Sequence, residues 1–193
     1  CADNLGGGSP NVYTEQTACR LFDNPNDQES TRFTCPVTQA GTPTITVTFP
    51  GGRGYRGMTV SVVQDADSID TGAINGQFQS ASTAASSGSV TPDTAGSLLL
   101  STTIGTAVGA NTITLEGGST SASNTGATDA CASQWKIHPS TSATSATFTF
   151  GSSDSLHTSV ITYRSSGGGG PPPVPVILPS SGLGGGMAMR KGG

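Results

Sequence analysis

The stretch Thr44-Ile45-Thr46-Val47-Thr48-Phe49 decides the fold class of this chain. Apolar and polar residues alternate strictly through it, so that Ile45, Val47 and Phe49 share one face. Pro50-Gly51-Gly52 follows and ends the alternation. A two-residue period is typical of a strand that is buried on one side. The stretch therefore predicts a β-strand.

Further short apolar segments follow, separated by turn-forming residues, and they predict strands at 58–63, 73–79, 98–100, 111–115, 135–138, 146–150 and 159–163. The segments 98–100 and 111–115 are expected to form a hairpin. Residues 80–97 are expected to be a loop because their Ser, Ala, Thr and Gly side chains are too small to fill a core, and 116–129 reads as a polar loop. No segment has a helical 3.6-residue period. The pattern predicts an all-β, immunoglobulin-like antiparallel β-sandwich.

Composition divides the chain into three parts. Residues 1–16 form an N-terminal lead-in, residues 17–165 carry the predicted strands, and residues 166–193 form a Gly/Pro-rich C-terminal arm. The arm opens with Gly167-Gly168-Gly169-Gly170, which is typical of a flexible linker. Pro171-Pro172-Pro173 then predicts a stiff polyproline II spacer.

The overall composition narrows the classes of function. Hydrophobic residues make up 33% of the chain, so the core must be small, but charged residues make up only 10%, and high charge is the other mark of a disordered chain. The net charge of −4 and the lack of a basic patch argue against a nucleic-acid partner. No run of 18 apolar residues is present, so no membrane span is predicted.

The four cysteines are Cys1, Cys19, Cys35 and Cys131. They are widely spaced and lack the close C-x-x-C pairs of zinc sites, so we interpret them as two disulfides in any of three connectivities. Disulfides indicate an oxidising compartment, and we expect an extracellular or cell-surface protein. Cys1 reads as a processed end, and a lipid-modified Cys1, as in bacterial lipoproteins, is the rival interpretation.

The order of several motifs is similar to that of a known family. The matching pieces are Ala18-Cys19, the strand that ends at Pro50-Gly51, Tyr55-Arg56-Gly57-Met58, Gly72-Ala73-Ile74-Asn75-Gly76-Gln77-Phe78, Cys131 through His138, 147–150 and 159–163. In this order, over residues 10–165, the chain resembles a Reeler domain, the module first seen at the N-terminus of reelin. It departs from the family after Phe150, where Gly-Ser-Ser replaces an aromatic residue and Ala-Pro, and in the length of the region 80–130.

The Reeler resemblance implies a non-enzymatic module of the kind found in extracellular matrix, guidance and innate-defence proteins. It also implies a disulfide between Cys19 and Cys131, which leaves Cys1 to pair with Cys35. Each bond would close a long loop and contribute a few kcal/mol in the chain-entropy picture.

Residues capable of catalysis are few. His138 and His157 are the only histidines, and His157 is expected in a turn at 154–158. Asp154 and a serine would complete a Ser/His/Asp set, but chance explains that match in a chain so rich in serine, and no nucleophile-elbow glycines support it. We therefore predict that the chain is not an enzyme and needs no cofactor.

Two further sets of polar residues offer ligand chemistry. Asp65, Asp67 and Asp70, and separately the loop Asp23–Glu29, offer oxygens to calcium, but neither has the pattern of a dedicated calcium loop, so solvated loops are favoured and no metal site is predicted. Arg53, Tyr55 and Arg56 are suited to an anionic or sugar ligand. The favoured interpretation is that Tyr55 packs while the arginines extend to solvent.

The C-terminal arm supplies the main functional hypothesis. Val174, Val176 and Leu178 fall on one face of an extended segment, which can add to a sheet edge or lie in a groove of a neighbouring copy. Head-to-tail contacts that do not close give a filament. We predict a structural subunit of an extracellular filament or surface assembly, a homopolymer linked through Pro171, Pro172, Pro173, Val174, Val176, Ile177 and Leu178. The alternative is a monomeric secreted Reeler-like module that binds a ligand or a microbial surface.

Covalent glycans are the remaining expectation. The chain has no N-x-[ST] site for N-linked sugar. The Ser/Thr-rich stretches 80–106 and 119–128 have the composition of O-glycosylated surfaces, and Pro171–Pro173 is a further candidate for sugar. Unmodified polar loops are the alternative interpretation of these stretches.

Overall fold

The computed structural model describes residues 2–3, 11–23, 28–36, 44–48, 60–64, 66–108, 112–125, 129–165 and 174–177. Within these ranges nearly all regular structure is β, so the chain is all-β as predicted. The strands are β1 (Ala2–Asp3), β2 (Thr14–Glu15), β3 (Leu21–Asp23), β4 (Gln28–Ser30), β5 (Phe33–Thr34), β6 (Ile45–Thr46), β7 (Ser61–Gln64), β8 (Ala66–Ser86), β9 (Ser97–Val108), β10 (Ile113–Leu115), β11 (Thr120–Thr125), β12 (Asp129–His138), β13 (Thr147–Ser165) and β14 (Val174–Ile177), and the 3-10 helix is η1 (Thr17–Cys19).

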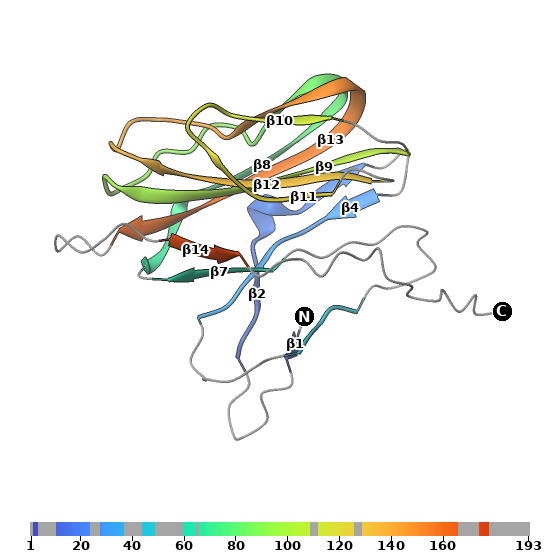
Figure 1. The fold of residues 1–193 in the computed structure, drawn as a ribbon. Coiled ribbons are helices and arrows are strands. Elements are labelled where there is room, and N and C mark those ends of the chain that lie inside the picture. The colour runs from blue at the N-terminus through green and yellow to red at the C-terminus, as the bar shows by residue number, and fades with distance from the viewer. Residues whose placement is uncertain are drawn as a thin grey trace.

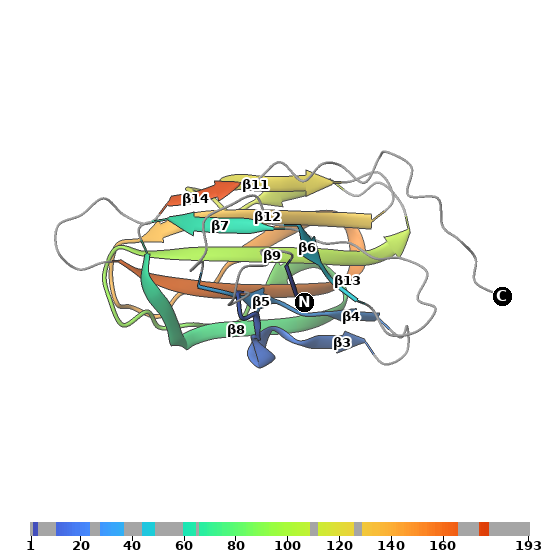
Figure 2. The same cartoon turned by 90° about the horizontal axis from the view of Figure 1, so that it is seen from below.

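Six strands form one antiparallel main sheet in the order β10-β13-β9-β12-β11, with β8 paired to β13. The long strand β13 organises this sheet, because its first residues pair with β10, its residues 156–163 pair with β9, and β8 follows it on the other edge. Short two-stranded pairs, β1–β6, β2–β5, β3–β4 and β7–β14, lie outside the main sheet. In Figures 1 and 2 the N-terminal strands and the β7–β14 pair lie on one face of the main sheet.

The main sheet folds over itself where β8 and β13 bend together, as the green and orange strands do in Figure 1. The pairing register shifts twice between Thr149 and Leu156 on β13, opposite residues 79–84 of β8, which include Ala81. Ala81 has a φ of 49°, the one positive value at a described residue other than glycine. Such irregularities bend a strand and raise its twist. The bend brings the first part of β13 over the remainder of the sheet.

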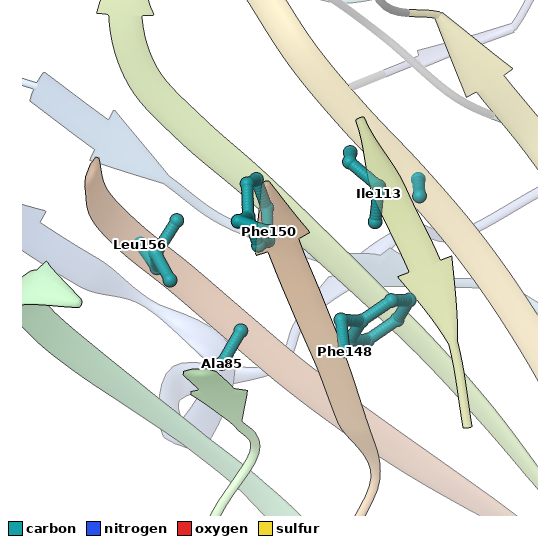
Figure 3. Close-up of a cluster of buried hydrophobic side chains, with 6 residues drawn as sticks. Ala85, Ile113, Phe148, Phe150 and Leu156 are labelled. Carbon is teal, nitrogen blue, oxygen red and sulfur yellow. The ribbon is translucent and has the colours of Figure 1, made fainter. Parts of the chain in front are cut away.

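One of the two buried apolar clusters lies inside this bend, and the other is formed by Ala73, Val90, Leu99, Ala146 and Val160. Figure 3 shows Phe148 and Phe150, from the first part of β13, in one cluster with Leu156 from the second part and with Ala85 and Ile113 from neighbouring strands. Both phenylalanines are 2% exposed. Complete burial of such a side chain contributes about 1.5–3 kcal/mol. These few large residues therefore carry much of the stability that a chain so poor in apolar groups can obtain.

Hydroxyl groups complete the interior where hydrophobic residues are lacking. Thr103 on β9 and Thr158 on β13 are both fully buried, and their hydroxyls hydrogen-bond at 2.9 Å. Buried Ser101 donates to the backbone oxygen of Gln134 at 3.3 Å. Because a buried polar group is tolerated when it is hydrogen-bonded, these pairs extend the core without hydrocarbon.

The structure confirms strands near most of the predicted positions. Ile45 and Val47 are half-buried while Thr44, Thr46 and Thr48 are exposed, which is the alternation that the sequence predicts, and Phe49 lies outside the described residues. The predicted strands at 73–79 and 135–138 fall within β8 and β12.

The two predicted loops are wrong in part. β8 continues through residues 80–86, and β11 occupies residues 120–125 of the region that was expected to be a polar loop. The error has a physical cause. Strand pairing requires backbone hydrogen bonds rather than large side chains, and threonine fits a pleated sheet well. A strand of small residues therefore cannot be predicted from the size of its side chains.

The predicted hairpin and the two last strands are also corrected. Residues 98–100 and 113–115 are in strands, but β9 pairs with β12 and β13 while β10 pairs with β13, so the two are not hairpin partners. The segments 146–150 and 159–163 belong almost entirely to one strand, β13. The predicted turn at 154–158 is also part of β13, whose pairing with β8 shifts register between Thr149 and Leu156.

Candidate functional site

Four residues of the predicted assembly arm, Val174–Ile177, form β14. It pairs antiparallel with β7 of the same chain, with Val174 opposite Gln64 and Val176 opposite Val62. Ile177 lies opposite Ser61. The predicted arm residues Pro171, Pro172, Pro173 and Leu178 lie outside the described residues. Residues 174–177 thus form a short strand, and its partner within the single chain is β7.

The β7–β14 pair is weak for two reasons. Pro175 lies opposite Val63, and proline has no backbone N–H to donate to the ladder. The pair is also a two-stranded sheet of its own, separate from the main sheet. An isolated two-stranded sheet is marginally stable in water at best. A competing strand can therefore displace β14 from β7 at a small cost in free energy.

The N-terminal segment docks on the main sheet around Gly76 of β8. A Cβ at Gly76 would lie 2.9 Å from the carbonyl oxygen of Ala18 and 3.2 Å from the side chain of Leu21. Only glycine allows this approach without a shift of the backbone. The sequence predicts a strand here, but the need for glycine comes from a segment almost sixty residues earlier in the chain.

Cys19 is completely buried at this contact and does not form the disulfide with Cys131 that the resemblance implies. Its Sγ lies 3.8 Å from the carbonyl oxygens of Asn75 and Val160. Cys131 is half-buried on β12, and β9 lies between β12 and β13. Across these strands Cys131 is level with His157, which is three residues along β13 from Val160, the residue that Cys19 contacts. With strand spacings of about 4.8 Å and a rise of about 3.3 Å per residue, the Cα atoms of Cys131 and Val160 are more than about 10 Å apart. A disulfide needs Cα atoms within about 7 Å.

The other two cysteines have different surroundings. Cys35 is half-buried just after β5, and its Sγ lies 3.2 Å from the carbonyl oxygen of Pro36. Cys1 lies outside the described residues, so its pairing with Cys35 stays a prediction.

Arg32 fastens the N-terminal segment to the centre of the main sheet. Its Nη1 donates to the backbone oxygen of Leu100 at 3.0 Å and to that of Ser159 at 3.4 Å. Burial raises the pKa of the Cys19 thiol and of the Tyr163 phenol, and the nearby Arg32 charge reduces both shifts. At neutral pH the thiol is therefore protonated and the arginine supplies the positive charge of this contact.

His157 lies on β13 and not in the predicted turn. It is 3% exposed, and its Nδ1 lies 3.2 Å from the hydroxyl of Ser30 on β4. The ring of Phe78 meets it edge-on at a centroid distance of 5.2 Å. Burial lowers the pKa of His157, and the charge of buried Asp23 opposes part of that shift. A neutral imidazole therefore joins the β3–β4 pair to the main sheet.

Neither Ser30 nor Arg32 is marked by a local sequence pattern, since their partners lie 127 and 68 residues away. His138, the other histidine that the sequence analysis considers, lies at the end of β12, where its Nε2 is 3.1 Å from the carbonyl oxygen of Ser142.

The carboxylates considered for calcium are used in a different way. Buried Asp70 accepts hydrogen bonds from the backbone N–H groups of Gly72 at 3.1 Å and Asp93 at 2.9 Å. Arg164 bonds to the Asp93 carboxylate at 2.5 Å and 2.7 Å, and this contact lowers the pKa of Asp93. Among the described residues no group of His, Cys, Asp or Glu is arranged to hold a metal ion. Arg53, Tyr55 and Arg56 lie outside the described residues.

Part of the stretch considered for O-linked sugar is closed to modification. Ser87, Ser97, Ser101 and Thr103 are buried in the interior. Exposed hydroxyls remain in the same stretch, at Ser80, Thr83 and Thr91.

No protein-family model matches this chain, and neither a curated protein nor a solved structure is similar enough to count as a match. Over the described parts of the chain, no helix has the length and apolar character needed to cross a bilayer.

Proposed function

We propose that this chain is a structural subunit of an extracellular assembly whose copies are linked through the C-terminal arm. The observation that carries the proposal is the pairing of β14 with β7 in a defined register. A contact made by a terminal strand within one chain can be made equally by the same strand of another chain, which is strand exchange. The Gly167–Gly170 linker in front of the arm gives it the reach for such an exchange.

The fold that we propose for the body is an immunoglobulin-like sandwich of the Reeler type. Its support is the bend in β8 and β13, which brings Phe148 over Leu156, because strands that change layers at bulges are a feature of packed sheets. We also propose that the chain is not an enzyme. The depth at which His157 is buried, with Ser30 and Asp23 closing around it, supports this proposal, since a catalytic base must reach a substrate.

The alternative function is a monomeric secreted module that binds a ligand or a microbial surface. The observation that favours it is the same pairing, because an arm that stays on its own β7 has no need of a second copy. The two functions therefore differ in one measurable property. In the assembly β7 pairs with β14 of another copy, and in the monomeric module it pairs with β14 of its own chain.

Crosslinking in register tests the proposal. Chains with Val62→Cys and one tag are mixed with chains with Val176→Cys and another tag, and the crosslinked peptides are identified by mass spectrometry after oxidation. We expect a bond between differently tagged chains, because Val62 and Val176 are directly opposite. Val63→Cys with Val176→Cys is the matched control, since neighbouring strand residues point to opposite faces. Absence of the bond between chains, together with its formation in the double variant of one chain, favours the monomeric module.

A further inference from the structure

The outer edge of the second half of β8 has neither charged residues nor proline to protect it. β8 is 21 residues long, and in the part of the chain that the structure describes β13 is the strand that pairs with it. Residues 71–92 contain no charged side chain. A long uncharged edge is a template for pairing with other chains, and natural proteins block such edges with charges, prolines or bulges.

The direction of the backbone groups near the end of β8 can be deduced from one hydrogen bond. The N–H of Ser87 donates to the backbone oxygen of Ala146 at 3.0 Å, so the backbone groups of Ser87 point toward the β13 side. In a strand the backbone groups of successive residues point to alternate edges. Those of Ala84 and Ser86, the last outward-facing residues of β8, therefore point to the outer edge.

Side chains of the same segment bond to these outward groups. The hydroxyl of Ser82 accepts from the N–H of Ala84 at 3.0 Å and donates to the carbonyl oxygen of Ala84 at 2.9 Å. The Nε2 of Gln79 donates to the carbonyl oxygen of Ser86 at 2.8 Å. A hydroxyl can donate and accept at once, which is why Ser82 serves both groups of one residue.

The bend in β8 makes these contacts reachable. Gln79 and Ser86 are seven residues apart and lie on either side of Ala81, whose φ is 49°. In a straight strand seven residues would span about 23 Å, far beyond the length of a glutamine side chain. The same irregularity that folds the main sheet over its core thus brings the Gln79 amide back to the edge.

We propose that the outer edge of β8 at residues 82–86 is a latent strand-pairing surface for a second copy of this chain, kept closed by the hydroxyl of Ser82 and the amide of Gln79. The partner that fits is β8 of the second copy. Two uncharged copies do not repel, and identical edges can pair antiparallel about a two-fold axis. The surface is separate from β7 and the arm, so the inference does not rest on the proposed function.

Amide hydrogen exchange of the full chain, measured by NMR, tests the closure. In Ser82→Ala we expect the Ala84 amide to exchange about tenfold faster than in the unchanged protein, because it loses its acceptor. Ser80→Ala is the matched control, as Ser80 is an exposed serine of the same strand. Ser82→Thr retains a hydroxyl and should retain slow exchange. Equal exchange rates in Ser82→Ala and Ser80→Ala would overturn the proposal.

Concentration dependence tests the partner. In the double variant Gln79→Ala with Ser82→Ala, we expect fast exchange of the Ala84 amide in dilute solution and slow exchange at high concentration, when β8 of a second copy supplies new acceptors. In the unchanged protein and in Ser80→Ala the rate should not depend on concentration. Fast exchange of the double variant at every concentration would rule out a second copy as the partner. Assembly through the arm leaves this readout unchanged, because β14 pairs with β7.

Discussion

The side-chain amide of Gln134 donates to the carbonyl oxygen of Thr147 at 2.8 Å and so ties β12 to the start of β13. The contact is part of a closed ring. The Oε1 of Gln134 accepts from the N–H of Glu116 at 3.0 Å, and the N–H of Thr147 donates to Oε2 of Glu116 at 3.0 Å. Lys136 adds an ion pair to Glu116, a member of this ring. The ring holds the folded-over part of the main sheet against the rest.

Replacement of Gln134 by Ala is expected to lower the free energy of unfolding by about 2–3 kcal/mol. Gln134 is 1% exposed, so its removal empties a buried site and takes away the partners of the Glu116 N–H and the Thr147 carbonyl. Urea unfolding with an unchanged m-value measures the loss. The control is Gln77→Ala on the exposed side of β8, which should change stability by less than about 0.5 kcal/mol. Equal effects at the two positions would contradict the role of the ring.

Replacement of Gly76 by Ala is expected to destabilise the protein by about 1–3 kcal/mol and to loosen the N-terminal segment. The added Cβ would lie 2.9 Å from the Ala18 carbonyl, so η1 must move away. Reaction of the buried Cys19 thiol with a thiol reagent under native conditions should become faster. Gly117→Ala is the control, since a Cβ there meets nothing within 4 Å. If the Cys19 reactivity of the two variants is the same, the close approach is not what buries Cys19.

Stability is expected to fall as the pH drops below the ordinary histidine value of 6.5. Burial lowers the pKa of His157 in the folded state, so the unfolded chain binds the proton first. The stabilisation is complete above pH 6.5 and is lost as the pH falls toward the lower folded pKa. Urea unfolding at pH 7.5 and pH 5 measures it. His157→Phe should remove this part of the pH dependence, and His138→Gln should keep it. If His157→Phe keeps the pH dependence and His138→Gln removes it, the effect does not come from His157.

Deletion of residues 171–193 is expected to leave a folded, soluble monomer. β14 pairs with β7 and not with a strand of the main sheet, so the apolar core stays intact. Val176→Asp with Leu178→Asp should give the same result with less disturbance. Light scattering and negative-stain microscopy measure the size of the particles. Filaments formed by either variant, or an unchanged protein that stays monomeric at high concentration, would show that the arm is not the linker.

The intact mass of the native protein is expected to exceed the 19.1 kDa of the sequence, because exposed hydroxyls on a surface so poor in charge are suited to glycan. Peptide mapping should locate the additions on exposed residues such as Ser80, Thr83 or Thr91 and not on buried Ser101. A native mass equal to the sequence mass would end the glycan proposal.

The sequence predicts strands whose apolar and polar residues alternate. It does not predict strands made of small residues, or contacts between residues far apart in the chain. The alternation around Ile45 and Val47 is confirmed in their burial, although the strand itself, β6, is only Ile45–Thr46. Residues 80–86 form a strand without large apolar groups, so only their pairing with β13 reveals it. The contact of Ser30 with His157 joins residues 127 positions apart, and no local pattern carries such information.

The hydroxyl pairs of the interior, such as Thr103 with Thr158, have a consequence for temperature. Unfolding of this chain hydrates hydroxyl and peptide groups as well as hydrocarbon. Exposure of polar surface lowers the heat capacity and exposure of apolar surface raises it, so the heat-capacity change should be small for a chain of 193 residues. A small change flattens the stability curve. The protein would then keep nearly the same free energy of unfolding in cold and in warm surroundings.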